Sequence, residues 1–91
     1  MENNLKYKVG YNVSWQSIDN ELYVFNEKNG EMFQLDNVSK EIFIGILSHK
    51  TIEQIADEIV QKFHVEQVIV YRDILEFCQD LLKQGLIMEA I

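Results

Sequence analysis

One cysteine and two histidines are the side chains of this 91-residue chain best suited to nucleophilic or metal chemistry. His49, His64 and Cys78 lie far apart in the sequence, and neither histidine stands at zinc-ligand spacing from the other or from the cysteine. The four glycines are isolated from one another, so the sequence contains no phosphate-binding glycine loop. The residues therefore predict no catalytic site, no metal site and no cofactor.

Three carboxylates, Asp73, Glu76 and Asp80, recur at spacings that place them on or near one side of a helix. Grouped carboxylates can hold a cation such as calcium. On the polar face of a helix, however, they far more often only keep the helix solvated. We therefore interpret them as surface residues.

The net charge of the chain indicates which partners it does not bind. Fifteen Asp and Glu oppose eight Lys and Arg, which gives a net charge of −7 and a pI near 4.6. A surface of this sign repels nucleic acid and anionic membranes, so we expect a peptide or protein partner. The sequence shows no signal peptide and no membrane-spanning run, and its single cysteine suits a reducing compartment. We expect a cytoplasmic protein that is a monomer or a weak homodimer.

The first half of the chain has the two-residue period of β-strands. Apolar and polar residues alternate over residues 7–16, which predicts a first strand. A turn at Asp19-Asn20 leads into two further β-rich runs, residues 22–25 and residues 31–35, which a second turn separates. We expect these strands to form an antiparallel meander whose last strand has a free edge.

The second half has the 3.6-residue period of helices. A first helix follows Asp36-Asn37, either of which can cap it. Thr51 begins a second helix with the pattern of a capping box. A third helix spans about residues 67–84 and ends at Gly85, which can adopt the left-handed backbone of a helix stop.

Together these elements predict an α+β fold, with a three-stranded antiparallel sheet followed by three helices. We expect a single domain over residues 1–91, because no linker or repeat interrupts the sequence. After the third helix, Leu86 and Ile87 should return to the core. The other expected core residues are Leu35, Phe43, Ile55, Ile59, Ile74 and Leu81.

Two features of the predicted fold favour binding over catalysis. The free edge of the third strand offers backbone N–H and C=O groups to an extended peptide. The third helix carries two adjacent apolar rows, more than the burial of one face requires. The rows are Val70, Ile74, Phe77 and Leu81, and then Tyr71, Leu75, Cys78 and Leu82. A protected edge and a purely structural stripe remain the alternatives, so the residue pattern alone supports a soluble α+β binding module.

A series of short motifs stands in a fixed order along the chain. They are Gly30-Glu31-Met32-Phe33-Gln34-Leu35-Asp36, Ile42-Phe43, Thr51-Ile52-Glu53-Gln54-Ile55-Ala56, Asp73-Ile74-Leu75-Glu76-Phe77 and Gly85-Leu86-Ile87. In order, spacing and total length, from about Trp15 to Ile87, they resemble the PqqD-like family. That family has a winged helix-turn-helix-like fold.

Members of the PqqD-like family act as RiPP recognition elements, which bind the leader segment of a ribosomally made, later modified precursor peptide. The resemblance therefore implies a protein that is not an enzyme and that takes up the leader as an extra strand, in the groove between the third strand and the third helix. By position, the implied leader-binding residues are Glu31, Met32, Phe33, Gln34, Val68, Tyr71, Arg72 and Leu75. Arg72 would be available for an acidic residue of the leader.

The resemblance also implies a maturation enzyme to which the leader is presented, either a leader peptidase or a radical SAM enzyme. Lasso peptide, radical-SAM peptide and pyrroloquinoline quinone type pathways all use such domains. The sequence does not choose among these pathways.

A DNA-binding winged-helix regulator is the alternative hypothesis, because it shares this order of elements. Its last helix would have to approach DNA phosphates, yet the segment from Glu66 to Lys83 carries two cations, Arg72 and Lys83, against four carboxylates. An enzyme subunit that uses Cys78 or His64 is a third hypothesis.

Overall fold

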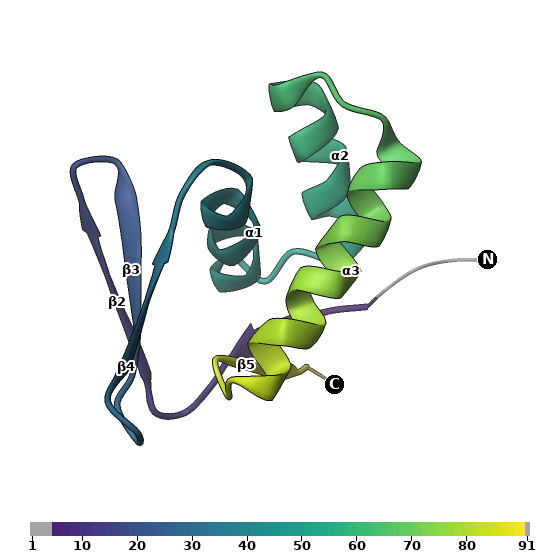
Figure 1. Cartoon of the computed structure of the whole chain (residues 1–91). Helices are drawn as coiled ribbons and strands as arrows, with labels where there is room; N and C mark the ends of the chain where they lie inside the picture. Colours follow the sequence, from purple (N-terminus) through teal and green to yellow (C-terminus); the bar gives the residue numbers. More distant parts are fainter. Residues whose placement is uncertain (1–4, 91) are drawn as a thin grey trace.

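The strands of the main sheet precede the helices along the chain, as Figure 1 shows. The computed structural model describes residues 5–90. The predicted α+β fold, a three-stranded antiparallel sheet followed by three helices, is confirmed. The elements are, in order, β1 (Tyr7–Val9), β2 (Val13–Ile18), β3 (Glu21–Asn26), β4 (Glu31–Leu35), α1 (Asn37–Leu47), α2 (Ile52–Phe63), α3 (Gln67–Lys83) and β5 (Ile87–Glu89).

The main sheet has the strand order β2-β3-β4 and is antiparallel throughout. Asp19 and Asn20 make the turn between β2 and β3 with φ angles of 51° and 69°. Their short polar side chains tolerate this left-handed backbone, which matches the twist of a tight hairpin. Within the described residues β4 pairs with β3 alone, so its outer edge has no strand partner.

The single first strand predicted over residues 7–16 is wrong, because the structure divides it into β1 and β2. β1 leaves the meander and pairs with β5 at the other end of the chain. The Gly10 N–H donates to the Leu86 carbonyl at 2.9 Å, and a Cβ on Gly10 would lie 2.6 Å from the Gly85 carbonyl oxygen. Only glycine permits this close approach, and the pairing joins segments that local periodicity cannot relate.

Two helix ends form as the sequence predicts. At the start of α2, the Gln54 N–H donates to Thr51 Oγ1 at 3.1 Å and the Thr51 N–H donates to Gln54 Oε1 at 2.8 Å, which is a capping box. At the end of α3, Gly85 has a φ of 74° and the Leu86 N–H donates to the Leu81 carbonyl at 2.9 Å. This Schellman stop turns the chain back toward the core.

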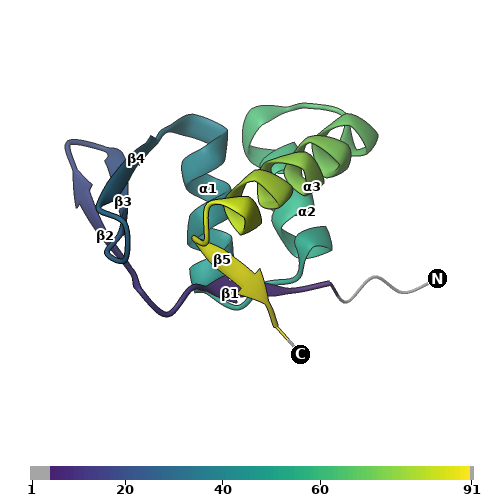
Figure 2. The same cartoon turned by 60° about the horizontal axis from the view of Figure 1, so that its bottom comes forward.

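The core lies mainly among the helices and the β1–β5 pair. In Figures 1 and 2, α1 stands between the three-stranded sheet on one side and α2 and α3 on the other. Phe43 of α1 is fully buried, and its ring meets the ring of Trp15 edge-on with 6.2 Å between centroids. Every predicted core residue is buried, including Leu86 and Ile87.

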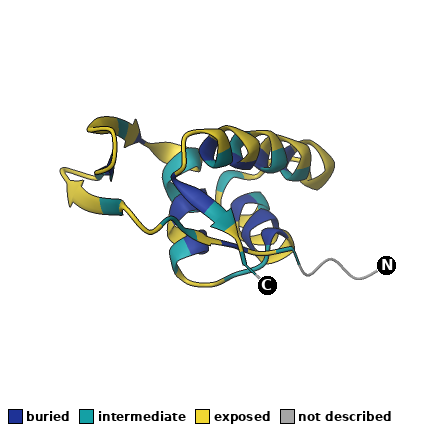
Figure 3. Ribbon diagram, turned by 90° about the horizontal axis from the view of Figure 1, so that it is seen from below, coloured by how far each residue is buried: buried dark blue, intermediate teal, exposed yellow. Residues whose placement is uncertain are grey.

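The edge strands β2 and β4 carry mostly exposed residues, whereas β3 between them alternates intermediate and buried residues. In Figure 3 the dark blue, buried stretches lie mainly on the helices and the β1–β5 pair. The outer edge of β4 remains accessible, because within the described residues no strand pairs with it and most of its residues are exposed. Among residues 5–90, no helix combines the length and the apolar character needed to cross a membrane.

Candidate functional site

A groove of about 470 Å³ runs between β4 and the C-terminal half of α3, and we call it the β4–α3 groove. It brings the backbone of an unpaired strand together with a partly apolar helix wall. This is the arrangement in which an incoming peptide can pair with the strand and place alternate side chains against the helix. Its lining residues are Met32, Phe33, Gln34, Leu35, Phe77, Asp80, Leu81, Lys83, Gln84 and Leu86.

Asn26, at the end of β3, ties the sheet that carries β4 to the end of α3. Its side chain is 7% exposed, and its Nδ2 donates to the Gln84 carbonyl at the end of α3 at 2.9 Å. Its Oδ1 accepts the Lys28 N–H at 3.0 Å, so both polar ends of the amide are satisfied. Because Gln84 itself lines the groove, this part-buried bond helps to set how closely the helix approaches the sheet.

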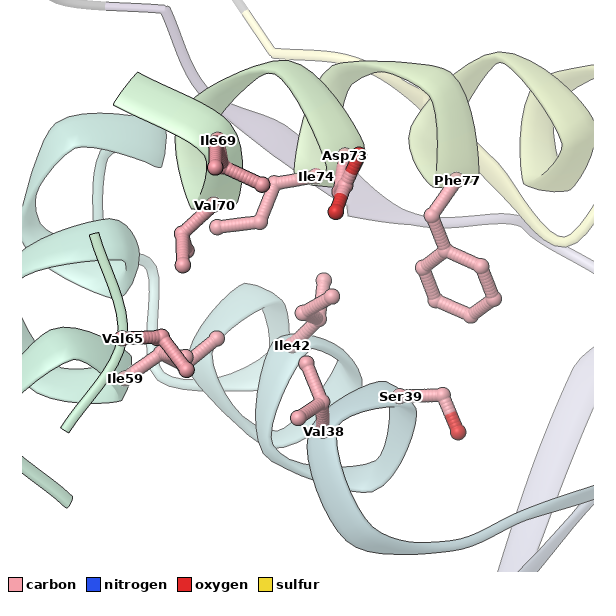
Figure 4. A pocket seen from close by; sticks show the side chains of 10 residues that line it. All are labelled: Val38, Ser39, Ile42, Ile59, Val65, Ile69, Val70, Asp73, Ile74 and Phe77. Carbon is pink, nitrogen blue, oxygen red and sulfur yellow. The ribbon is translucent and has the colours of Figure 1, made fainter. Parts of the chain in front are cut away.

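A second space of about 350 Å³ continues the groove toward the start of α3, and we call it the α1–α3 cavity (Figure 4). Phe77 lines both spaces. In Figure 4 the side chains of Ile74 and Phe77 point from α3 toward α1. Asp73 is the one charged residue and Ser39 the one uncharged polar residue in this mainly apolar lining, which consists of Val38, Ser39, Ile42, Ile59, Val65, Ile69, Val70, Asp73, Ile74 and Phe77.

The strand residues predicted for binding lie at the β4–α3 groove, with one exception. Met32, Phe33 and Gln34 line it, and Met32 is 56% exposed. Glu31 is exposed at the start of β4 but does not line the groove, and its N–H donates to Asn29 Oδ1 at 3.0 Å. Gln34 Nε2 donates to Glu21 Oε2, so one polar side chain of β4 is directed to the neighbouring strand.

The predicted helix residues do not line the groove. Val68 and Arg72 lie about 2.5 and 1.4 turns before Phe77 along α3, which places them near the opposite side of the helix. Val68 is accordingly 81% exposed. Tyr71 and Leu75 are half-buried and pack against the core instead.

The wall is formed by the other apolar row of α3, through Phe77 and Leu81, with Asp80 and Gln84 beside it. The sequence identifies this row as apolar but does not show which row faces the sheet. That rotation depends on the contacts of α3 with its neighbours α2 and β5, which the periodicity of α3 alone does not show. The local signal for the correct face is the Gly85 stop, because it returns the chain beside Leu81.

Cys78, His49 and His64, the residues best suited to chemistry, do not line the β4–α3 groove. Cys78 is fully buried, and burial raises the pKa of its thiol to about 12, so the thiol stays protonated at neutral pH. His49 and His64 adopt left-handed backbone with φ angles of 63° and 56°, and His64 ends α2. Within residues 5–90, no cluster of three or more His, Cys, Asp or Glu side chains could hold a metal ion.

Comparison with known protein families identifies the family of this chain. Residues 21–87 match the family described as coenzyme PQQ synthesis protein D (PqqD). The chain belongs to the PqqD family. The match begins at β3 and runs through α3 into β5, so it includes both walls of the β4–α3 groove.

Two solved structures share the PqqD-family fold of this chain. One, described as TbiB1 in complex with the TbiA(beta) leader peptide, is 27% identical with a TM-score of 0.86, and the alignment covers 92% of this chain and 98% of that one. The other, described as lasso peptide synthetase B1 complexed with the leader peptide, is 19% identical with a TM-score of 0.85, covering 91% and 98%. No curated protein sequence matches the chain significantly.

Proposed function

We propose that the chain is a RiPP recognition element that binds the leader segment of a ribosomally synthesised precursor peptide and presents it to a maturation enzyme. The leader adds a strand to the free edge of β4 and places alternate side chains in the β4–α3 groove. The chain itself contributes binding and no catalysis. We also propose that residues 1–91 form one domain of this kind and that it works in the cytoplasm.

The observation that carries this proposal is the position of the unpaired edge of β4 beside the groove. A free edge offers N–H and C=O groups that attract any extended chain. The groove makes this edge selective, because Phe33 on the strand and Phe77 on the helix offer apolar surface to the side chains of the arriving peptide.

The comparisons support the same proposal. Both similar structures are described as complexes with leader peptides, and one of them names a lasso peptide synthetase. We therefore favour a lasso peptide pathway among the pathways open to the PqqD family. In such a pathway the maturation partner is a separate leader peptidase.

The energetics of the groove suit a transient complex. Backbone hydrogen bonds to β4 and leader side chains anchored in the groove favour binding. Ordering a leader that is disordered when free costs about 2 to 5 kcal/mol. We expect affinity in the micromolar range or somewhat tighter, which holds the leader and still releases it.

Titration of the purified chain with a fluorescent leader, from the precursor peptide encoded beside it, tests this function. A scrambled peptide of the same composition and a short duplex DNA are the controls. Saturable binding of the leader alone supports the proposal. Equal binding of the scrambled peptide, or binding of DNA alone, would overturn it.

A further inference from the structure

Two carboxylates flank Phe77 on the helix wall. Asp73 lines the α1–α3 cavity, Asp80 lines the β4–α3 groove, and Phe77 lines both. Both aspartates are exposed to solvent. A peptide that covers Phe77 must therefore pass close to at least one of them.

Neither carboxylate is neutralised within the described part of the chain. Asp80 makes no ion pair there. Asp73 Oδ1 lies 3.9 Å from Arg72 Nε, and these side chains are 64% and 66% exposed, so their attraction is weak. Both aspartates thus keep the capacity to pair with a cation that a ligand brings.

Taken together, the linings of the β4–α3 groove and the α1–α3 cavity carry more negative than positive charge. Lys83 is the one lysine or arginine that lines either space, against Asp73 and Asp80. Arg72, which the sequence analysis made available to an acidic leader residue, lies away from the groove. An acidic leader side chain near Phe77 would consequently meet repulsion from both sides.

The spacing of these residues suits an extended peptide. Along α3 the rise between Phe77 and Asp73 is about 6 Å, and between Phe77 and Asp80 about 4.5 Å. Side chains two positions apart on one face of a strand are separated by about 6.6 Å. A long basic side chain two positions from the residue over Phe77 therefore reaches a carboxylate.

We propose, as a refinement that rests on the proposed function, that the bound leader carries an apolar residue over Phe77 and a lysine or arginine two positions from it. Asp73 and Asp80 are the specificity-determining residues for that basic residue. The apolar contact supplies most of the affinity, and the carboxylates select among peptides that can all pair with β4.

Selection from a random library of about 12-residue peptides tests this pattern without knowledge of the natural leader. The wild-type chain should enrich peptides with an apolar residue and a basic residue two positions away. The variant Asp73→Asn/Asp80→Asn should keep the apolar enrichment and lose the basic one. The variant Glu53→Gln/Glu89→Gln removes two exposed charges remote from the groove, and it should enrich the same peptides as the wild type.

The affinities of a selected peptide and of its Lys→Gln or Arg→Gln counterpart then give the magnitude of the preference for a basic residue. The wild type should bind the basic form about three- to tenfold more tightly at low salt, because exposed ion pairs are weak. The Asp73→Asn/Asp80→Asn variant should bind both forms equally. Enrichment of neutral or acidic peptides by the wild type, or an unchanged preference in this variant, overturns the proposal.

The same experiment separates this proposal from the function on which it rests. Peptides that bind the wild type but bind Phe77→Asp equally well would contradict the groove itself, and a library from which nothing is enriched would contradict peptide binding altogether. If the enriched peptides depend on Phe77 but show no preference for a basic residue, only the proposed selection by Asp73 and Asp80 is contradicted.

Discussion

Phe77 lines both the β4–α3 groove and the α1–α3 cavity. We expect Phe77→Asp to weaken leader binding at least tenfold, since it removes the apolar contact and adds a third negative charge to the helix wall. Phe77 is half-buried, so circular dichroism should show that the variant remains folded. Fluorescence titration of the leader measures the loss.

Val68→Asp is the matched control for this change. It introduces the same charge on the same helix, at a side chain that is 81% exposed and lies outside the groove. Binding should remain within about twofold of the wild type. A larger loss from Val68→Asp than from Phe77→Asp would place the leader on the opposite face of α3.

Because the Cys78 thiol is buried, we expect the free energy of unfolding to fall at alkaline pH. The thiol pKa is about 12 in the folded chain against 9.0 in the unfolded one, so the unfolded chain releases this proton first as the pH rises. The free energy of unfolding should therefore be unaffected below about pH 9 and should fall above it, by about 2 kcal/mol at about pH 10.5. Urea unfolding at neutral pH and at that pH measures the difference.

The variant Cys78→Ala should lose the part of this pH dependence that the thiol causes. Burial also raises the pKa of Tyr7, and the part of the Tyr7 shift that burial causes remains in both proteins. Leader binding at neutral pH should not change, because Cys78 lies outside the groove. Loss of function from Cys78→Ala in a folded protein would instead revive the hypothesis of an enzyme subunit.

At the scale of elements, the free edge of β4 is the feature that the proposed function needs most. When the leader pairs with this edge, the β4 amides that point away from β3 should exchange their hydrogens more slowly. β2 is the other edge of the same sheet and provides the internal control. Hydrogen exchange followed by NMR should show protection confined to β4, and protection of β2 would mean that the peptide adds to the wrong edge.

The packing of α1 on α2 depends on Gly45. A Cβ at this position would lie 2.6 Å from Ile55 Cγ1, so a larger residue must push the two helices apart. We expect Gly45→Val to lower the free energy of unfolding by about 1 to 3 kcal/mol, as urea denaturation would show. Ile44→Ala, at a neighbouring position that is 41% exposed, should cost less than about 1 kcal/mol. If both variants lower the free energy of unfolding equally, the close contact between Gly45 and Ile55 does not determine how α1 packs on α2.

The sequence predicts most elements because their signals are local. The Asp19-Asn20 turn, the Thr51 capping box and the Gly85 stop each act over a few residues, and each forms as expected. The β1–β5 pair joins segments far apart in the sequence, and the rotation of α3 depends on its tertiary contacts with α2 and β5. At the candidate site, the residue pattern identifies β4 as one wall, but it does not show which apolar row of α3 forms the other.

At the scale of the whole molecule, charge separates the peptide-binding function from the DNA-binding alternative. The chain carries a net charge of −7, and Asp73 and Asp80 are exposed on the helix that would have to enter the major groove. We expect no detectable binding of a short duplex DNA even at low salt, as measured by fluorescence anisotropy. DNA binding that weakens steeply with added salt would favour the winged-helix regulator.

The central claim concerns both what binds and where it binds, so the most direct test is an NMR titration of the isotope-labelled chain with its leader peptide. Saturable changes in the amide signals of Met32, Phe33 and Gln34 on β4 and of Phe77 and Leu81 on α3 are the predicted result. Changes centred on the opposite face of α3 or on β2, or no change at all, would contradict the account.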